Sequence, residues 1–224
     1  MANYYPIMLD VRGRRAIVVG GDQIAAEKAQ ALCESGADVT VISPSFCRAM
    51  RGLGESAALT LRQKAYAPGD LADAFVVVAA TGDAELIDAI WAEAQARGQL
   101  VNVVDVPGRC NFIIPSILRR GQLTIAVSTE GASPSLAKRI RQRLENLFPP
   151  AYGAYLQMAA AARSRLRAGG VSYAERDRFF GEYMESDALE RISAGDAAGA
   201  AATTASLLQR YGVEAAPAVL EETC

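Results

Sequence analysis

A glycine pair between an apolar run and a helical pattern sets the strongest limit on how this chain can fold. Residues 16–32 read AIVVGGDQIAAEKAQAL, an apolar run followed by Gly20, Gly21 and a segment with helical spacing. A near-continuous apolar run is typical of a strand buried on both faces. A strand, a glycine turn and a helix in this order form the phosphate-binding unit of dinucleotide-binding folds. The sequence therefore predicts an α/β fold that begins with such a unit.

The loop departs from the dinucleotide pattern Gly-x-Gly-x-x-Gly/Ala at one position. Gly20 and Ala25 fit its first and third positions, but Asp22 occupies the second. Backbone N–H groups and the positive helix end hold phosphate in such loops. Two like charges about 4 Å apart repel by ~4 kcal/mol at an effective dielectric of 20, roughly a thousandfold in affinity. The loop is either a weakened dinucleotide site or part of a scaffold that has lost its nucleotide, and the direction of the Asp22 side chain decides the size of the effect.

Strands and helices alternate through the first half of the chain. Strand patterns are found at residues 15–20, 38–43, 59–66, 74–81 and 100–105, and helical patterns at residues 23–36 and 83–98. Gly36 and Gly98 fit helix ends, and Asp83 or Thr81 fits the cap of the second helix. This alternation predicts a parallel sheet with right-handed crossovers.

The pattern changes after residue 105. Two apolar segments, residues 111–118 and 123–129, are predicted as strands outside the parallel sheet, and helical patterns follow at residues 133–148, 153–168, 173–185 and 197–212. We expect an α/β protein with three parts. They are a Rossmann-like parallel sheet at residues 1–112, a small strand-containing dimerisation and substrate region at residues 113–149, and a helical domain with a C-terminal tail at residues 150–224.

Composition narrows the chemistry. The 23 basic and 25 acidic residues give a net charge of −2, which does not favour nucleic acid as a partner, and the chain has no histidine. Proton transfer must then fall to Asp, Glu, Lys, Tyr or Cys, and no metal-ligating residues are expected. No apolar run reaches the length of a membrane span, and the N-terminus lacks a signal-peptide pattern. The four scattered cysteines fit reduced thiols in a cytoplasmic protein.

Four long segments together resemble a known family. They are YYPIMLDVRGRRAIVVGGDQIAAEKAQALCESGADVTVISP, VVAATGDAELIDAIWAEAQARGQLVNVVD, CNFIIPSILRRGQLTIAVSTEGASPSLAKRIRQRLENLFP and ERDRFFGEYMESD, and they span roughly residues 4–210. The chain resembles the precorrin-2 dehydrogenase/sirohydrochlorin ferrochelatase family, the N-terminal module of siroheme synthase. That family usually carries three consecutive glycines in the loop, whereas this chain has Gly20, Gly21 and Asp22.

The resemblance implies an activity and a key residue. Family members oxidise precorrin-2 to sirohydrochlorin with NAD+, and several insert Fe2+ to give siroheme; Co2+ is an alternative metal substrate. The family's key aspartate falls on Asp105, beyond a strand end where ligands of open α/β sheets bind. Its carboxylate could accept protons in both reactions, or it could simply cap the turn that follows. The resemblance also implies a homodimer. The alternative function is a metal chelatase or tetrapyrrole-binding homologue that has lost NAD binding through Asp22.

Candidate cofactor contacts gather around the ends of the predicted strands. Asn102 is either a buried amide or a cofactor contact, Thr81 is either a helix cap or a cofactor neighbour, and Ser43 replaces the usual acidic partner of the ribose. Cys110 fits a buried small residue better than a nucleophile, because no histidine is present to activate it. The candidate cofactor-binding residues are Gly20, Gly21, Asp22, Gln23, Ile24, Ser43, Pro44, Thr81 and Asn102.

A second group of candidates fits an anionic tetrapyrrole. The substrate of the family carries eight carboxylates, which favour helix N-termini, hydroxyls and basic groups. The segment STEGASPSLAKRIRQR offers all three, and Arg119 and Arg120 add charge before it. The alternative is a solvated basic helix face. The candidate substrate-binding residues are Asn111, Ser128, Thr129, Gly131, Ser133, Lys138 and Arg139.

Overall fold

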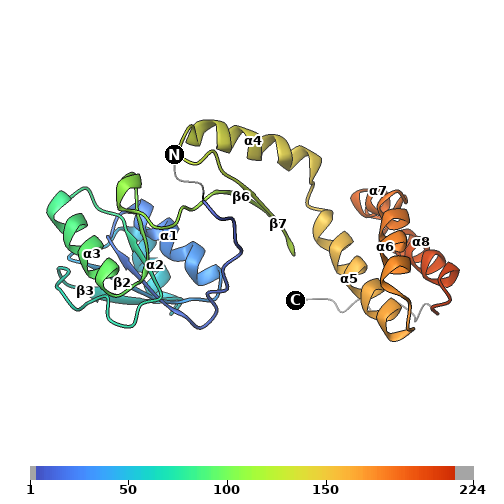
Figure 1. The fold of residues 1–224 in the computed structure, drawn as a ribbon, viewed down its shortest axis with the longest axis horizontal. Helices are drawn as coiled ribbons and strands as arrows, with labels where there is room; N and C mark the ends of the chain where they lie inside the picture. Colours follow the sequence, from blue (N-terminus) through green and yellow to red (C-terminus); the bar gives the residue numbers. More distant parts are fainter. Residues whose placement is uncertain (1–3, 215–224) are drawn as a thin grey trace. The chain divides into compact units, whose positions relative to one another are not determined.

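The structure is a computed structural model that describes residues 4–214. The chain divides into two compact units between Ile114 and Pro115 (Figure 1). Most of the expected C-terminal tail, including Cys224, lies outside the described residues. Cys33, Cys47 and Cys110 are free thiols.

The first unit is built on a five-stranded sheet with the order β3-β2-β1-β4-β5. Every neighbouring pair is parallel, as the alternation of strands and helices predicted. Because β1 pairs with both β2 and β4, the strand order reverses direction there, and ligands of open α/β sheets bind at that switch point. The strands are β1 (Arg15–Val19), β2 (Asp38–Ser43), β3 (Thr60–Gln63), β4 (Val76–Ala79) and β5 (Leu100–Val103).

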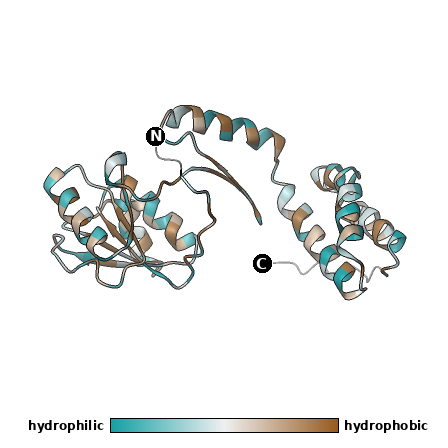
Figure 2. Ribbon diagram, viewed as in Figure 1, coloured by the Kyte–Doolittle hydropathy of each residue, from teal (hydrophilic) through white to brown (hydrophobic). Residues whose placement is uncertain are grey.

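Helices cover both faces of this sheet. Alternate residues of β1 enter two different clusters: Val18 packs with Ala25 and Met50, whereas Ile17 packs with Ile90. The central strands β1 and β4 are therefore apolar on both faces, and Figure 2 shows the apolar interior of this unit in brown. The helices are α1 (Gln23–Glu34), α2 (Arg48–Glu55) and α3 (Ala84–Ala96), and a short 3-10 helix covers Pro107–Arg109.

The second unit starts with an antiparallel pair that stands apart from the parallel sheet, as the sequence predicted. Strands β6 (Ser116–Arg120) and β7 (Leu123–Val127) both contact α4 (Pro134–Leu147). Ser133 caps α4 by accepting a hydrogen bond from Leu136 N. Helix α4 carries an apolar stripe that is open to solvent: Leu136, Ile140 and Leu147 are 50%, 37% and 67% exposed.

Four further helices pack around their own core. Tyr155 and Tyr183 stack and each donates its hydroxyl to the other's carbonyl oxygen, which ties α5 to α6. The helices are α5 (Tyr152–Ala168), α6 (Tyr173–Met184), α7 (Ala188–Ser193) and α8 (Ala197–Arg210). Over residues 4–214, none of the helices combines the length and apolar character that a membrane crossing requires.

Candidate functional site

The glycine loop lies between the ends of β2 and β4. Gly20 has φ +141°, a conformation that favours glycine. A Cβ atom on Gly20 would overlap the carbonyl oxygen of Ala80, and one on Gly21 would overlap that of Ser45. Gly21 O also accepts a hydrogen bond from Cys47 N at 2.7 Å. Both glycines are therefore required by contacts within the protein itself.

Asp22 turns its side chain onto the N-terminus of α1. Its Oδ1 accepts a hydrogen bond from Ala25 N at 2.8 Å, and its backbone oxygen accepts one from Ala26 N. The carboxylate thus satisfies one of the helix donors that a bound phosphate would otherwise use. Among the described residues, the N–H groups of Gln23 and Ile24 make no such bond. The start of α1 thus keeps these two donors for a phosphate, with a negative charge next to them.

The neighbouring strand ends complete this edge of the sheet. Ser43 is buried at the end of β2, and Pro44 leads into the loop that rests on Gly21. Thr81 follows β4, and its Oγ1 accepts a hydrogen bond from Asp83 N. Asp83 caps α3 by accepting from Glu85 N and Leu86 N, which resolves the two sequence alternatives for that cap. The candidate cofactor residues before Asn102 thus gather at the carboxyl ends of β1, β2 and β4.

Asp105 projects from a tight turn after β5. Val106 N donates to Val103 O at 3.3 Å to close the turn, and Val104 N donates to Ala79 O of β4. Asp105 has φ +60°, is exposed, and within residues 4–214 its carboxylate accepts no hydrogen bond. The side chain therefore does not cap its own turn, and the carboxylate is free at the same edge of the sheet as the glycine loop.

The two candidate asparagines of this unit are engaged with backbone. Asn102 Nδ2 donates to Phe112 O at 3.1 Å. Asn111 uses both ends of its amide: Oδ1 accepts from Val101 N and Nδ2 donates to Gln99 O, each at 2.8 Å. Burial raises the pKa of the Cys110 thiol, which keeps it protonated and agrees with the absence of an activating partner. A cofactor role for Asn102 and a substrate role for Asn111 remain predictions.

The candidate substrate residues of the second unit order the loop before α4. Ser128 Oγ accepts from Glu130 N and Thr129 Oγ1 accepts from Ser133 N, while Gly131 has φ +86°. Lys138 and Arg139 are exposed on α4 and make no ion pair within the described residues. These residues form a loop of hydroxyls followed by two free cations. Arg119 is exposed on β6, whereas Arg120 donates to Phe148 O.

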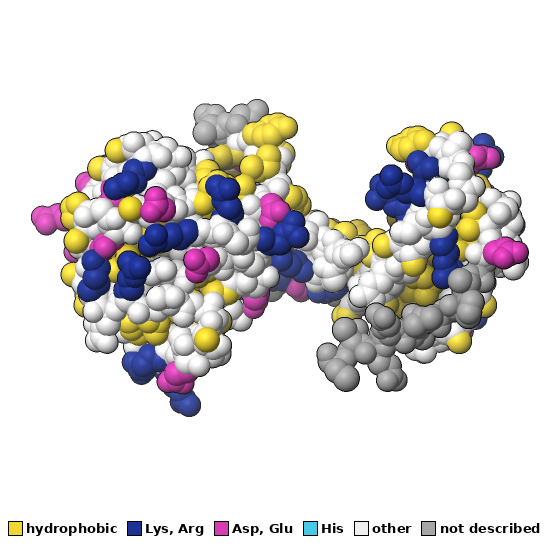
Figure 3. Space-filling view, turned by 90° about the horizontal axis from the view of Figure 1, so that it is seen from below, with side chains coloured by type: hydrophobic (Ala, Val, Ile, Leu, Met, Phe, Trp, Pro, Cys, Tyr) yellow, Lys and Arg dark blue, Asp and Glu magenta, His cyan; other side chains and the backbone are white. Residues whose placement is uncertain are grey.

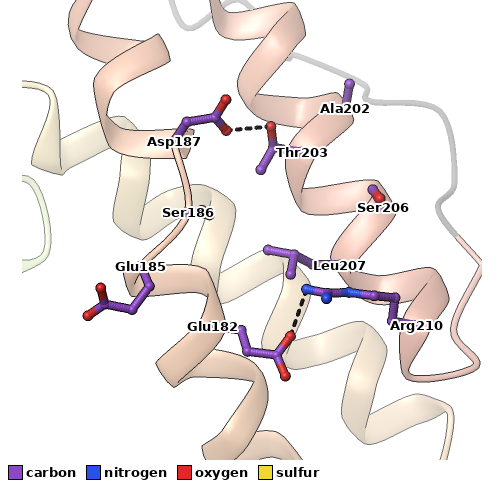
Figure 4. A pocket seen from close by; sticks show the side chains of 9 residues that line it. All are labelled: Glu182, Glu185, Ser186, Asp187, Ala202, Thr203, Ser206, Leu207 and Arg210. Atoms are coloured by element: carbon purple, nitrogen blue, oxygen red, sulfur yellow. Dashed lines mark hydrogen bonds and ion pairs between the residues drawn. The ribbon is translucent and has the colours of Figure 1, made fainter.

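One hollow in the second unit was not indicated by the sequence. It measures about 690 Å³ and is lined by the end of α6, the turn that follows α6, and α8 (Figure 4). Most of its charged groups have local partners: Arg210 pairs with Glu182 at 2.7 Å, and Thr203 donates to Asp187. None of the sequence-predicted site residues lines it. On the first unit, basic and acidic side chains are interspersed over the face shown in Figure 3.

Comparisons with known proteins show which proteins this chain is similar to. A family model described as "Putative NAD(P)-binding" matches residues 7–116, and one described as "Sirohaem biosynthesis protein central" matches residues 120–147. Siroheme synthase of Nitrosococcus oceani is 38% identical over 192 residues, 86% of this chain and 41% of the relative. That of Chromobacterium violaceum is 36% identical over 216 residues, 96% of this chain and 46% of the relative. The chain spans less than half the length of these curated relatives.

A solved structure extends the agreement to almost the whole chain. SirC, a precorrin-2 dehydrogenase, has a TM-score of 0.76 and 27% identity, and the match covers 93% of this chain and 99% of that one. A parallel sheet with a glycine loop at its switch point, joined to a sirohaem-type central segment, defines a Rossmann-type protein of the NAD(P)-binding class. The chain belongs to the precorrin-2 dehydrogenase/sirohydrochlorin ferrochelatase family, as its resemblance to that family implied.

Proposed function

We propose that this chain is an NAD-dependent precorrin-2 dehydrogenase that oxidises precorrin-2 to sirohydrochlorin. The observation that carries the proposal is the common edge of the sheet shared by the glycine loop and the free Asp105 carboxylate. Only β4 separates β1 from β5, so at ~4.8 Å between strands their ends lie roughly 10 Å apart. A dinucleotide bound across this edge reaches from the loop towards Asp105. The likeness to SirC over 99% of that chain supports the assignment.

In the proposed reaction, the start of α1 binds the cofactor phosphate and Asp105 accepts the proton. The oxidation removes a hydride and a proton from the substrate, and NAD+ supplies the hydride acceptor. Gln23 N and Ile24 N are the phosphate donors at the start of α1. The Asp105 carboxylate takes the proton, since no histidine is present in the chain. The hydride carries both electrons that the substrate loses, and the proton accounts for the second hydrogen atom.

The second unit supplies the proposed tetrapyrrole contacts. The hydroxyl loop at Ser128 and Thr129 offers donors to carboxylates, and Lys138 and Arg139 offer charge. We assign cofactor binding to residues 1–112, substrate and dimer contacts to residues 113–149, and a supporting role to residues 150–224. The free thiols fit a cytoplasmic location.

We also propose a homodimer in which α4 supplies part of the interface. Leu136, Ile140 and Leu147 line one face of that helix and are substantially exposed in the single chain. Exposed apolar stripes of this kind mark association surfaces. Sedimentation of the purified protein should show a dimer, and Ile140→Asp should shift it towards monomer. A monomer before substitution would contradict the dimer without affecting the proposed reaction.

One observation favours a second candidate function. The Asp22 carboxylate occupies a helix donor that a dinucleotide phosphate would use. A protein that lost NAD binding in this way could still act as a chelatase, with Fe2+ or Co2+ as substrate and Asp105 taking the pyrrole protons. The deciding assay follows sirohydrochlorin absorbance and NADH fluorescence from precorrin-2 and NAD+. Stoichiometric NADH supports the dehydrogenase; metal insertion without NADH formation supports the chelatase.

A further inference from the structure

The free edge of β5 is closed by a returning segment rather than by another strand. Because β5 ends the sheet, its outward backbone groups need partners from elsewhere. Val101 N and O bond to Asn111 Oδ1 and Asn111 N at 2.8 and 3.0 Å. Val103 N donates to Cys110 Sγ at 3.2 Å. Two side chains thus imitate the backbone of a missing strand.

The same segment fastens the turn that carries Asp105. The Cys110 thiol lies 3.3 Å from Val103 O and 3.4 Å from Val106 O, and so faces the residues at both ends of that turn. One S–H can donate to either carbonyl while the sulfur accepts from Val103 N. Burial raises the thiol pKa and preserves this proton. Cys110 and Asn111 form what we call the β5 brace.

The turn needs such support because of its backbone conformation. Asp105 has φ +60°, a left-handed conformation that is strained for a residue with a Cβ. Conformations of this kind persist only where the surrounding structure holds them, and they gather at functional sites. The turn is held by the bond from Val106 N to Val103 O that closes it, by the bond from Val104 N to Ala79 O, and by the brace.

We propose that Cys110 and Asn111 are positioning residues for the reaction at Asp105. The β5 brace holds the turn in its left-handed conformation and so fixes the Asp105 carboxylate at the carboxyl edge of the sheet. The kinetic part of the proposal rests on the proposed function, whereas the structural part does not. Neither residue touches the reacting atoms, and both act through the turn.

A thermodynamic cycle tests the structural part without any catalytic assay. Asp105→Gly relieves the left-handed strain only while the brace holds the turn there. Asp105→Gly should therefore lower the unfolding equilibrium constant of the otherwise unaltered protein about tenfold more than it lowers that of the Cys110→Ala variant. Asn111→Ala should show the same coupling. Equal effects of Asp105→Gly in all backgrounds would overturn the proposal, because the brace would then not hold the turn.

Kinetics with NAD+ and precorrin-2 test the positioning role. Cys110→Ala and Asn111→Ala should each lower kcat about tenfold, since small misplacements of a reacting group are costly. The KM for NAD+ should change less than about twofold, because the glycine loop is untouched. Cys110→Ser should recover most of the loss, because a hydroxyl both donates and accepts. Cys33→Ala is the matched control: its thiol is also partly buried and bonds Ala58 O, and it should leave kcat unchanged.

The outcomes separate the two proposals. An unchanged kcat in both alanine variants refutes the positioning role even if the cycle shows coupling. If the unaltered protein forms no NADH at all, the proposed function fails, and the cycle alone then judges whether the brace holds the turn.

Discussion

Replacing Asp22 by glycine should tighten NAD+ binding. The Asp22 carboxylate caps α1 through Ala25 N at 2.8 Å, so a phosphate on Gln23 N and Ile24 N would lie about 4 Å from it. At that separation like charges repel by ~1 kcal/mol in water and ~4 kcal/mol at an effective dielectric of 20. Because Asp22 is exposed, we expect the lower part of this range, about 1–2 kcal/mol, or roughly 5- to 30-fold in affinity.

The cost to the fold should be small. Glycine at a helix N-cap loses only about a few tenths of a kcal/mol relative to a capping side chain, so the variant should remain folded. Asp22→Asn is the matched control, because it keeps a capping oxygen and removes the charge. If charge dominates, Asn should give most of the gain; if bulk dominates, only Gly should.

Calorimetric titration with NAD+ at low and high salt measures the effect. The difference between the unaltered protein and Asp22→Gly should shrink as salt rises, because exposed charges are screened. Equal affinities for all three proteins at low salt would refute the electrostatic argument. No binding by any of them would favour the chelatase candidate instead.

Three other substitutions probe separate parts of the molecule. Asp105→Ala should abolish precorrin-2 oxidation, and metal insertion if present, while circular dichroism stays unchanged; retained rates would remove it from the mechanism. Replacing Lys138 and Arg139 by Ala should weaken tetrapyrrole binding and flatten its salt dependence, seen by fluorescence titration. Burial would raise the pKa of Glu93, but bonds from Tyr66 Oη and two backbone N–H groups lower it. The ionised Glu93 carboxylate therefore stabilises the fold above pH about 4.3, and this contribution is lost as the pH falls through its lowered pKa. The free energy of unfolding, measured in urea, should then decrease less between neutral and acidic pH in Glu93→Gln than in the unaltered protein.

Long periodic elements could be predicted from the sequence, and short ones could not. The strands around Val18 and Val77 are continuous apolar runs, and α4 begins at Pro134 directly after its cap Ser133. Both signals can be recognised within a few neighbouring residues. Helices α2 and α7 were missed. Helix α2 has eight residues, two of them glycines, and buries only Met50, and α7 has six residues with only Ala188 buried, so each is too short to repeat a helical pattern in the sequence.

The candidate site was predictable in position but not in detail. Parallel strands end at one edge, so Gly20 and Asp105 could be placed together from the order of elements alone. The direction of the Asp22 side chain could not be predicted, because the sequence is the same whether the side chain caps the helix or points outward. The bonds of Asn111 to β5 depend on a chain reversal ten residues after Val101, and no local pattern encodes that contact.

The packing around Gly20 and Gly21 changes how this motif should be interpreted in other genomes. A side chain at either position would collide with backbone of Ala80 or Ser45 whether or not a nucleotide is bound. Selection for a folded protein alone would then retain both glycines after the loss of nucleotide binding. Position 22, where a side chain is accommodated as a helix cap, is not constrained by the fold in this way, so the two glycines by themselves do not show that a related protein still binds the nucleotide.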